Sequence, residues 1–179
     1  DMEEYHDLHL TLRLFKSLMS EPEFKNLESG IVLQAYLPDA LAAMVRLQEW
    51  AARRVAAGGA PVKVRVVKGA NLPMEQMQAS LMGWPVATVA SKQEADTNYK
   101  RVLNYALTPE HLAHVRIGVA GHNLFDIAFA HTLSVERGVA DRVEFEMLQG
   151  MAAEQQGPIS EDVGQLLLYV PAVRPAEFD

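Results

Sequence analysis

The stretch "VKVRVVKGAN", residues 62–71, decides the fold class. Its valines at positions 62, 64 and 66 alternate with Lys63, Arg65 and Val67, and a period of two is typical of a β-strand. Helical patterns precede and follow the stretch, so we expect helices to cover the strand. A strand that is buried on both faces should be apolar on both faces. An inward Arg65 does not fit this expectation.

Outward from this strand, helical and extended patterns alternate along the chain. A capping box at Asp1 and Glu4 predicts the start of a helix that runs to Met19. Further helices are predicted at 40–57, 73–83, 93–107 and 124–137, and a helical or irregular stretch at 150–163. Strands are predicted at 30–36, 62–67, 115–121, 142–148 and 165–171, with a short extended segment at 85–91. No linker or low-complexity tract interrupts residues 1–179, which we interpret as one domain.

Strands that alternate with helices predict a parallel sheet with right-handed crossovers. A doubly wound sheet needs a glycine-rich turn such as G-x-G-x-x-G after its first strand, and the chain has none. Polar residues instead gather where the strands end, at Gln34, Lys68, His122-Asn123 and Tyr169, as in a (β/α)8 barrel. A complete barrel takes about 250 residues. We therefore predict an α/β fold, an incomplete (β/α)8 TIM-like barrel with about the last five strands.

Composition excludes several classes of protein. The 179 residues are 49% hydrophobic and 22% charged, as in an ordinary globular domain, and carry a net charge of −7 with a pI near 5.4. Scattered basic residues in an acidic chain argue against a nucleic-acid partner. Zero cysteines exclude disulfides and thiolate sites and fit a reducing cytoplasm. No apolar run approaches the roughly 20 residues of a membrane span, and no signal sequence is present.

An inward Arg65 is the main functional signal. In a barrel, Val64 and Val66 would face the helices, whereas Arg65 and Val67 would face the interior, where an unpaired arginine costs several kcal/mol. The arginine then needs an anion or a strong acceptor, and Gly69 would let a flat group approach the backbone.

Other interpretations of these residues stay open. Arg65 could pair with a core carboxylate. Lys68, at a strand end, could form a Schiff base in a class I aldolase-type barrel, or the chain could be a non-catalytic truncated module. The pairs His6/His9 and His111/His114 have the spacing of helical metal ligands, but no third ligand is evident, so no metal site is predicted.

Five segments together carry a resemblance to a known family: "DMEEY" (1–5), "GIVLQAYLPDA" (30–40), "VRVVKGAN" (64–71), "GHN" (121–123) and "EFEMLQGM" (144–151). In this order and spacing they resemble the proline dehydrogenase family, specifically the barrel of the bifunctional bacterial proline utilisation enzymes. The resemblance implies a distorted (β/α)8 barrel that binds FAD, oxidises L-proline to 1-pyrroline-5-carboxylate and passes electrons to a membrane quinone. It also implies a cytoplasmic, peripherally membrane-associated enzyme with an aldehyde dehydrogenase domain in the parent chain.

The resemblance also implies site residues. Catalytic or substrate-packing roles would fall to Asp1, Arg65, Leu148 and Tyr169. The FAD contacts would be Gln34, Arg65, Val67, Lys68, Gly69, Ala70, Ser91, Lys92, His122, Asn123 and Leu148, with Arg65 beside the flavin N5.

Three departures from the family pattern are visible. Asn71 stands where the family usually has a tyrosine, and Gly121 where a threonine is common. The chain also begins after the strand that carries an active-site lysine in the family, and it stops before the eighth helix, whose paired arginines hold the proline carboxylate. We therefore expect the isolated chain to hold most flavin contacts and yet be inactive.

Overall fold

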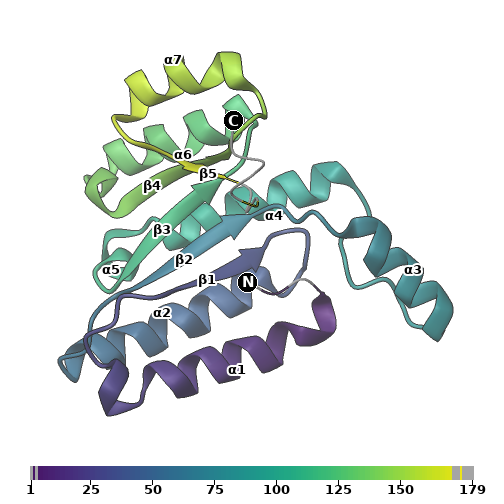
Figure 1. Ribbon diagram of the computed structural model, residues 1–179, viewed down its shortest axis with the longest axis horizontal. Helices are drawn as coiled ribbons and strands as arrows, with labels where there is room; N and C mark the ends of the chain where they lie inside the picture. The colour runs from purple at the N-terminus through teal and green to yellow at the C-terminus, as the bar shows by residue number, and fades with distance from the viewer. Residues whose placement is uncertain (1, 3, 171–173, 175–179) are drawn as a thin grey trace.

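The computed structural model describes residue 2, residues 4–170 and residue 174. In sequence order, β1 (Gly30–Gln34), β2 (Val62–Val67), β3 (Val115–Ala120), β4 (Val143–Leu148) and β5 (Leu166–Tyr169) pair side by side into one parallel sheet (Figure 1). A doubly wound sheet reverses its strand order at a switch point, whereas the wall of a barrel continues in one direction. The consecutive order therefore confirms the predicted part of a (β/α)8 barrel.

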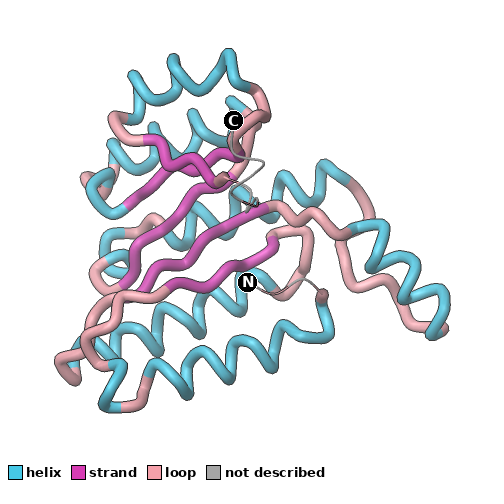
Figure 2. Tube along the Cα trace, in the orientation of Figure 1, coloured by secondary structure: helices cyan, strands magenta, loops and turns pink. Residues whose placement is uncertain are grey.

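Helices cover one face of the sheet. The helices are α1 (Leu8–Met19), α2 (Ala40–Ala56), α3 (Leu72–Met82), α4 (Lys92–Ala106), α5 (Pro109–Leu112), α6 (Leu124–Glu136) and α7 (Ala153–Val163). Figures 1 and 2 show α2, α4 and α6 behind the strands, with α1 next to α2, while no helix of the described chain lies over the opposite face. That opposite face is the interior of the barrel.

Two details differ from the sequence-based expectation. The first helix begins with a 3-10 turn at Tyr5–Asp7, and Asp7, the N-cap of α1, makes no side-chain capping bond. Asp1, the proposed cap, lies outside the described residues. Residues 85–91, predicted as a short extended segment, belong to no helix and to no strand of the sheet, and the Val89 amide donates to the Tyr36 carbonyl at 2.8 Å.

The hydrophobic core lies between the sheet and its helices. Val62, Val64 and Val66 of β2 are buried there, whereas Lys63 and Arg65 of the same strand are only partly buried on the other face. The core continues into α2 and α4 through Met44, Leu47, Val102 and Leu103. The predicted two faces of β2 are therefore confirmed.

A buried arginine, Arg54, holds together the loops that precede β1 and β2. Arg54 of α2 donates hydrogen bonds to the carbonyl oxygens of five residues in the surrounding loops: Met19, Phe24, Lys25, Leu27 and Ala60. Buried carbonyl groups need such donors, because an unpaired polar group is costly away from water. Arg54 therefore has a structural role.

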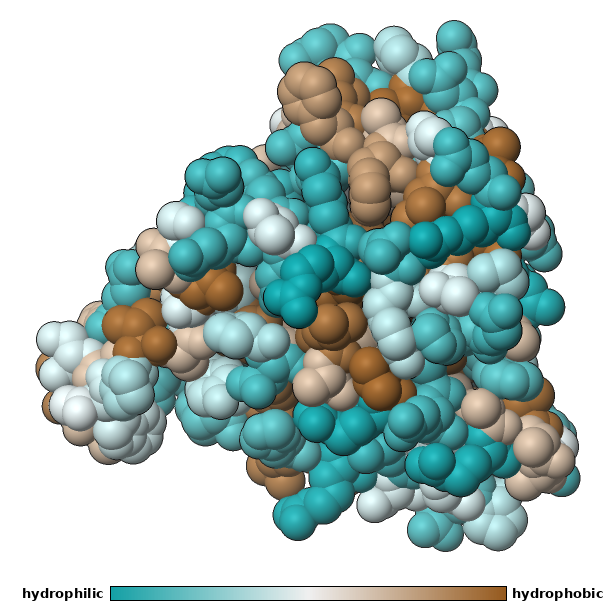
Figure 3. Space-filling view, turned by 180° about the vertical axis from the view of Figure 1, so that it is seen from behind, coloured by the Kyte–Doolittle hydropathy of each residue, from teal (hydrophilic) through white to brown (hydrophobic). Residues whose placement is uncertain are grey.

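The sheet and the helix layer both leave apolar surface open. In β5, Leu167, Leu168 and Tyr169 are each more than a third exposed, as expected of an edge strand. Helix α3 projects from the body, at the lower left of Figure 3, and bears exposed apolar residues that include Met77 and Leu81. Within the described ranges, no helix is both long enough and apolar enough to cross a membrane.

Candidate functional site

A cavity of about 360 Å³ opens at the carboxyl ends of β1 to β4. Because parallel strands all end at the same edge of a sheet, residues far apart in the chain meet there. Of the predicted site residues, the cavity is lined by Gln34, Arg65, Val67, Lys68, Gly69, Ala70, His122, Asn123 and Leu148. Residues that the sequence did not single out also line it, among them Tyr99, Asp126 and Glu146.

Arg65 meets a carboxylate across the sheet. Its Nε donates to Oε2 of Glu146 on β4, and the other oxygen of Glu146 lies 2.6 Å from Lys63 Nζ. The side chain of Glu146 is fully buried. The interpretation in which Arg65 pairs with a core carboxylate is therefore correct, and the pair stands in the wall of the cavity.

The Lys63 ammonium is held by two acidic residues. Burial by itself would lower the pKa of Lys63, but hydrogen bonds to Glu144 and Glu146, together with their negative charges, outweigh burial and raise it. Lys63 therefore stays charged beneath the cavity.

Lys68 belongs to a second cluster of charges. Its Nζ lies 2.5 Å from Asp126 Oδ2 and also pairs with Asp96, which in turn accepts from Lys92 at 2.7 Å. Burial would lower the pKa of Lys68, yet the bonds to Asp126 and Asp96 raise it above its ordinary value. A Schiff-base lysine needs a lowered pKa to present a neutral amine, so this environment disfavours the aldolase interpretation.

The buried Tyr99 of α4 packs next to this cluster of charges. Its hydroxyl donates to the carbonyl of Ala120 at 3.1 Å, and its ring centroid is 5.7 Å from Lys68 Nζ. Burial raises the pKa of Tyr99, and the negative charges of Asp126 and Glu146 raise it further. The phenol is therefore a neutral group that is held by its bond to Ala120.

Two buried polar atoms at the cavity lack a partner within the described part of the chain. Gln34 donates from Nε2 to the Met2 carbonyl at 3.1 Å, while its Oε1 accepts nothing. His122 Nε2 accepts from the Leu148 amide at 3.4 Å, which leaves Nδ1 as the donor of a neutral imidazole, and this buried atom has no partner. One acceptor and one donor are thus left for a ligand.

Gly69 has a structural role in addition to the expected one. Its φ is +121°, and a Cβ there would lie 2.6 Å from the ring of Tyr36. The glycine is thus required for the backbone conformation and for the packing of Tyr36, in addition to lining the cavity. A larger residue at this position would disturb the loop itself and not only the approach of a ligand.

Three predicted residues, Tyr169, Ser91 and Lys92, do not line the cavity. Asp1 lies outside the described residues. Tyr169 packs its ring over the guanidinium of Arg65, with 4.1 Å between the Arg65 Cζ and the ring centroid. Ser91 caps α4 by accepting from the Glu94 amide at 3.1 Å, and Lys92, whose side chain is 79% exposed, reaches the Lys68 cluster only through Asp96.

Glu146 could have been found from the sequence. Period-two alternation in 143–148 puts Val143, Phe145 and Met147 on one face and Glu144 and Glu146 on the other, the same signal that singled out Arg65. Asp126 and Tyr99 carried no such signal, because a polar residue on an amphipathic helix is ordinarily solvent-exposed.

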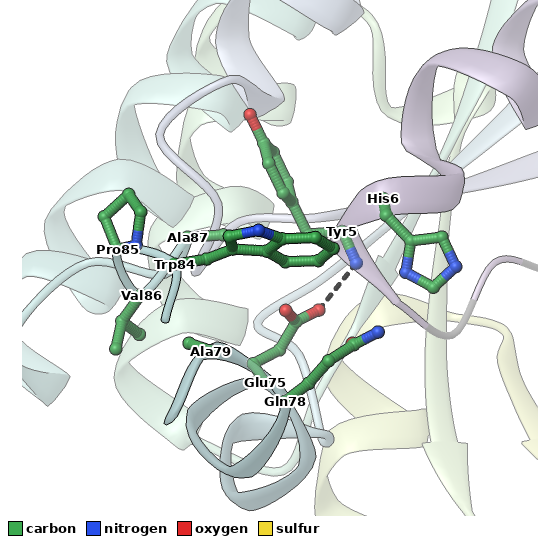
Figure 4. A pocket seen from close by; sticks show the side chains of 9 residues that line it. All are labelled: Tyr5, His6, Glu75, Gln78, Ala79, Trp84, Pro85, Val86 and Ala87. Carbon is green, nitrogen blue, oxygen red and sulfur yellow. Dashed lines mark hydrogen bonds between the residues drawn. The ribbon is translucent and has the colours of Figure 1, made fainter. Parts of the chain in front are cut away.

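A second cavity of about 310 Å³ lies between the 3-10 turn at Tyr5–Asp7 and α3. Figure 4 shows the Trp84 ring above the Glu75 carboxylate, which accepts the Tyr5 amide at 2.6 Å. This second cavity shares no lining residue with the first one. The contacts around it join the 3-10 turn to α3.

One histidine of each pair makes side-chain contacts within the protein. His6 lies near Glu4 and Asp7, and the ring of His111 stacks on Tyr105 with a centroid distance of 4.1 Å. Across residues 2, 4–170 and 174, no three His, Asp or Glu side chains gather as a metal site would require.

Comparisons with known proteins agree on one family. The proline dehydrogenase family model matches residues 1–178. Proline dehydrogenase 1 of Bacillus subtilis (strain 168) is 26% identical over 172 residues, which are 96% of this chain and 48% of that protein.

Solved structures of larger proteins contain the same fold. Proline utilization A from Corynebacterium freiburgense matches with a TM-score of 0.94 and 54% identity, over 99% of this chain and 18% of that chain. Proline utilization A from Bdellovibrio bacteriovorus, inactivated by N-propargylglycine, matches with a TM-score of 0.85 and 37% identity, over 97% of this chain and 18% of that chain. The present chain therefore spans only part of each of these proteins.

Proposed function

Because the chain belongs to the proline dehydrogenase family, we propose that it forms part of an enzyme that oxidises L-proline to 1-pyrroline-5-carboxylate with bound FAD and passes the electrons to a quinone. The proposed enzyme is cytoplasmic, binds the membrane surface peripherally and carries an aldehyde dehydrogenase domain elsewhere in its chain. The observation that carries the proposal is the cavity at the strand ends, where the cation of Arg65 stands near the unpaired polar atoms of Gln34 and His122.

The residues present fit a flavin. The flavin ring offers a donor N–H, which suits the acceptor Gln34 Oε1, and the ribityl and phosphate groups of FAD offer acceptors, which suit the donor His122 Nδ1. A ligand that used both atoms would remove the cost, about 1–3 kcal/mol each, of leaving buried polar atoms unpaired. When bound, FAD supplies the ring that accepts a hydride.

Arg65 supplies the charge that such a reaction needs. Negative charge develops on the acceptor during hydride transfer, and a cation that is already in place stabilises it without reorganisation. Because Nε is anchored to Glu146 and one face of the guanidinium is covered by Tyr169, the group is held in one position. Its lining of the cavity supports the proposed contact with the cofactor.

The residues that follow β3 suit an anionic part of the cofactor. Asn123 caps α6, its Oδ1 accepting the Phe125 amide at 2.9 Å, and His122 precedes it with an unpaired Nδ1. The amino end of a helix favours negative charge. We assign His122 and Asn123 to the ribityl and phosphate side of FAD, with Ser91 and Lys92 as further phosphate-side residues.

The substrate side of the proposal uses apolar packing. Leu148 lines the cavity and Tyr169 lies over Arg65, so both are placed near the cation. We assign them to packing on the ring of L-proline, and Asp1 to ordering the site.

The test is the spectrum and activity of the purified full-length protein. We expect flavin absorbance, release of FAD on denaturation, and reduction of a dye that depends on L-proline. Arg65→Met should abolish most of this activity, whereas Arg101→Met, an exposed change on α4, should not.

Two other results would contradict the proposal. A colourless protein that borohydride and a ketone modify at Lys68 would favour an aldolase. A colourless protein that neither reacts nor takes up added FAD would favour a non-catalytic module.

A further inference from the structure

We propose that Glu146 is a positioning residue for Arg65: it fixes the guanidinium in the cavity wall and offsets part of its charge, and so sets how readily the bound cofactor is reduced. The inference rests on the proposed flavin function and deepens it. It assigns a role to the buried carboxylate of Glu146. It also assigns a role to Gly118, whose missing side chain leaves the space in which Glu146 and Arg65 meet.

The register of the sheet explains how the pair forms. Arg65 on β2 lies opposite Gly118 on β3, and Glu146 on β4 lies opposite Ala120 on β3. The two charged side chains belong to strands that are not neighbours, so they must meet above β3. Gly118 has no side chain in the way, whereas a Cβ there would lie 2.9 Å from Lys63 Cε and even closer to Glu146 Oε1. Real Cβ atoms essentially never approach other atoms so closely.

Both oxygens of Glu146 are committed to cations. Oε2 accepts from Arg65 Nε, and Oε1 lies 2.6 Å from Lys63 Nζ. Glu146 is 1% exposed, so water screens these interactions little. A buried carboxylate between two cations both fixes their positions and lowers the net positive charge that they present to the cavity.

Arg65 is fixed on two sides and open on a third. Glu146 holds its Nε, and the Tyr169 ring covers one face of the guanidinium. Among the described residues, neither terminal nitrogen of Arg65 has a hydrogen-bond partner. These nitrogens stay available to a ligand in the cavity that Arg65 lines.

A purely structural ion pair and a positioning pair have different consequences. Loss of a structural pair would change the stability of the protein alone. Loss of the negative charge beside Arg65 should also favour the reduced, more negative cofactor and raise its midpoint potential.

The experiment compares the wild-type full-length holoenzyme with Glu146→Gln, which keeps the shape and an acceptor oxygen but removes the charge. We expect the equilibrium constant for cofactor reduction to rise about tenfold, a shift of about 30 mV for a two-electron couple. The matched control is Glu144→Gln, two residues away on the same face, which should shift that constant less than twofold. Gly118→Ala retains every charge but pushes the carboxylate away from Arg65, and should shift the potential in the same direction as Glu146→Gln.

The outcomes separate this inference from the proposed function. One outcome would overturn the positioning role alone. In it, the wild-type protein binds flavin and Glu146→Gln changes the unfolding of the deflavinated protein, but the midpoint potential of Glu146→Gln equals that of Glu144→Gln. A wild-type protein that binds no FAD would overturn the proposed function and this inference with it.

Discussion

Replacement of Lys68 by methionine tests the charge cluster beside the cavity. Methionine keeps most of the apolar stem of Lys68 but removes the ammonium that pairs with Asp126 at 2.5 Å and with Asp96. Asp126 is 4% exposed, so its carboxylate would remain buried without its nearest cation.

The expected loss follows from these contacts. Breaking a buried ion pair from one side costs about 3–5 kcal/mol. Lys100 Nζ remains 3.9 Å from Asp126 Oδ1, and its side chain is 42% exposed. In water-like surroundings the attraction between these two charges is about 1 kcal/mol, which offsets part of the loss. We therefore expect Lys68→Met to lower the free energy of unfolding by about 2–4 kcal/mol.

Urea unfolding of the 179-residue chain, followed by circular dichroism, measures this loss. Lys92→Met is the control, since Lys92 is 79% exposed and should change stability by less than about 0.5 kcal/mol. The double variant Lys68→Met/Asp126→Leu removes both charges and should recover to within about 1 kcal/mol of wild type. A single variant as stable as wild type, or a double variant no better than the single, would refute the reasoning.

Three further changes have definite expected outcomes. Hydrogen bonds from Lys68 and Lys92 lower the pKa of Asp96 below its ordinary 3.8, so the ionised Asp96 stabilises the fold above that pH. The difference in the free energy of unfolding between wild type and Asp96→Asn should therefore be constant from about pH 5 to 8 and vanish in acid, as measured by unfolding at a series of pH values. Arg65→Met in the full-length enzyme should weaken FAD binding and lower the flavin midpoint potential in a redox titration; unchanged values would remove Arg65 from the site. Arg54→Met should cost about 3–5 kcal/mol in urea unfolding, because several buried carbonyls lose their donor; a loss below about 1 kcal/mol would show that water replaces it.

The sequence predicted the fold because its signals are local. Alternation over 62–67 fixed which side chains of β2 face the helices, and the buried Val62, Val64 and Val66 confirm it. The repeated strand and helix pattern then limited the fold to a parallel sheet. Because every parallel strand ends at the same edge, the polar residues Gln34, Lys68 and His122 could be expected to meet, and they line one cavity.

The partners of those residues were decided only by the tertiary structure. Alternation shows that Arg65 and Glu146 point inward, but 81 residues separate them in the chain, and their pairing depends on the register of both strands with β3 and on the space that Gly118 leaves. Likewise, Asp126 reaches Lys68 only because α6 packs beside α4, and Gly69 is needed for the ring of Tyr36 as well as for the cavity. Periodicity is a property of a few consecutive residues, whereas register and helix packing minimise the free energy of the whole core, so no short segment specifies them.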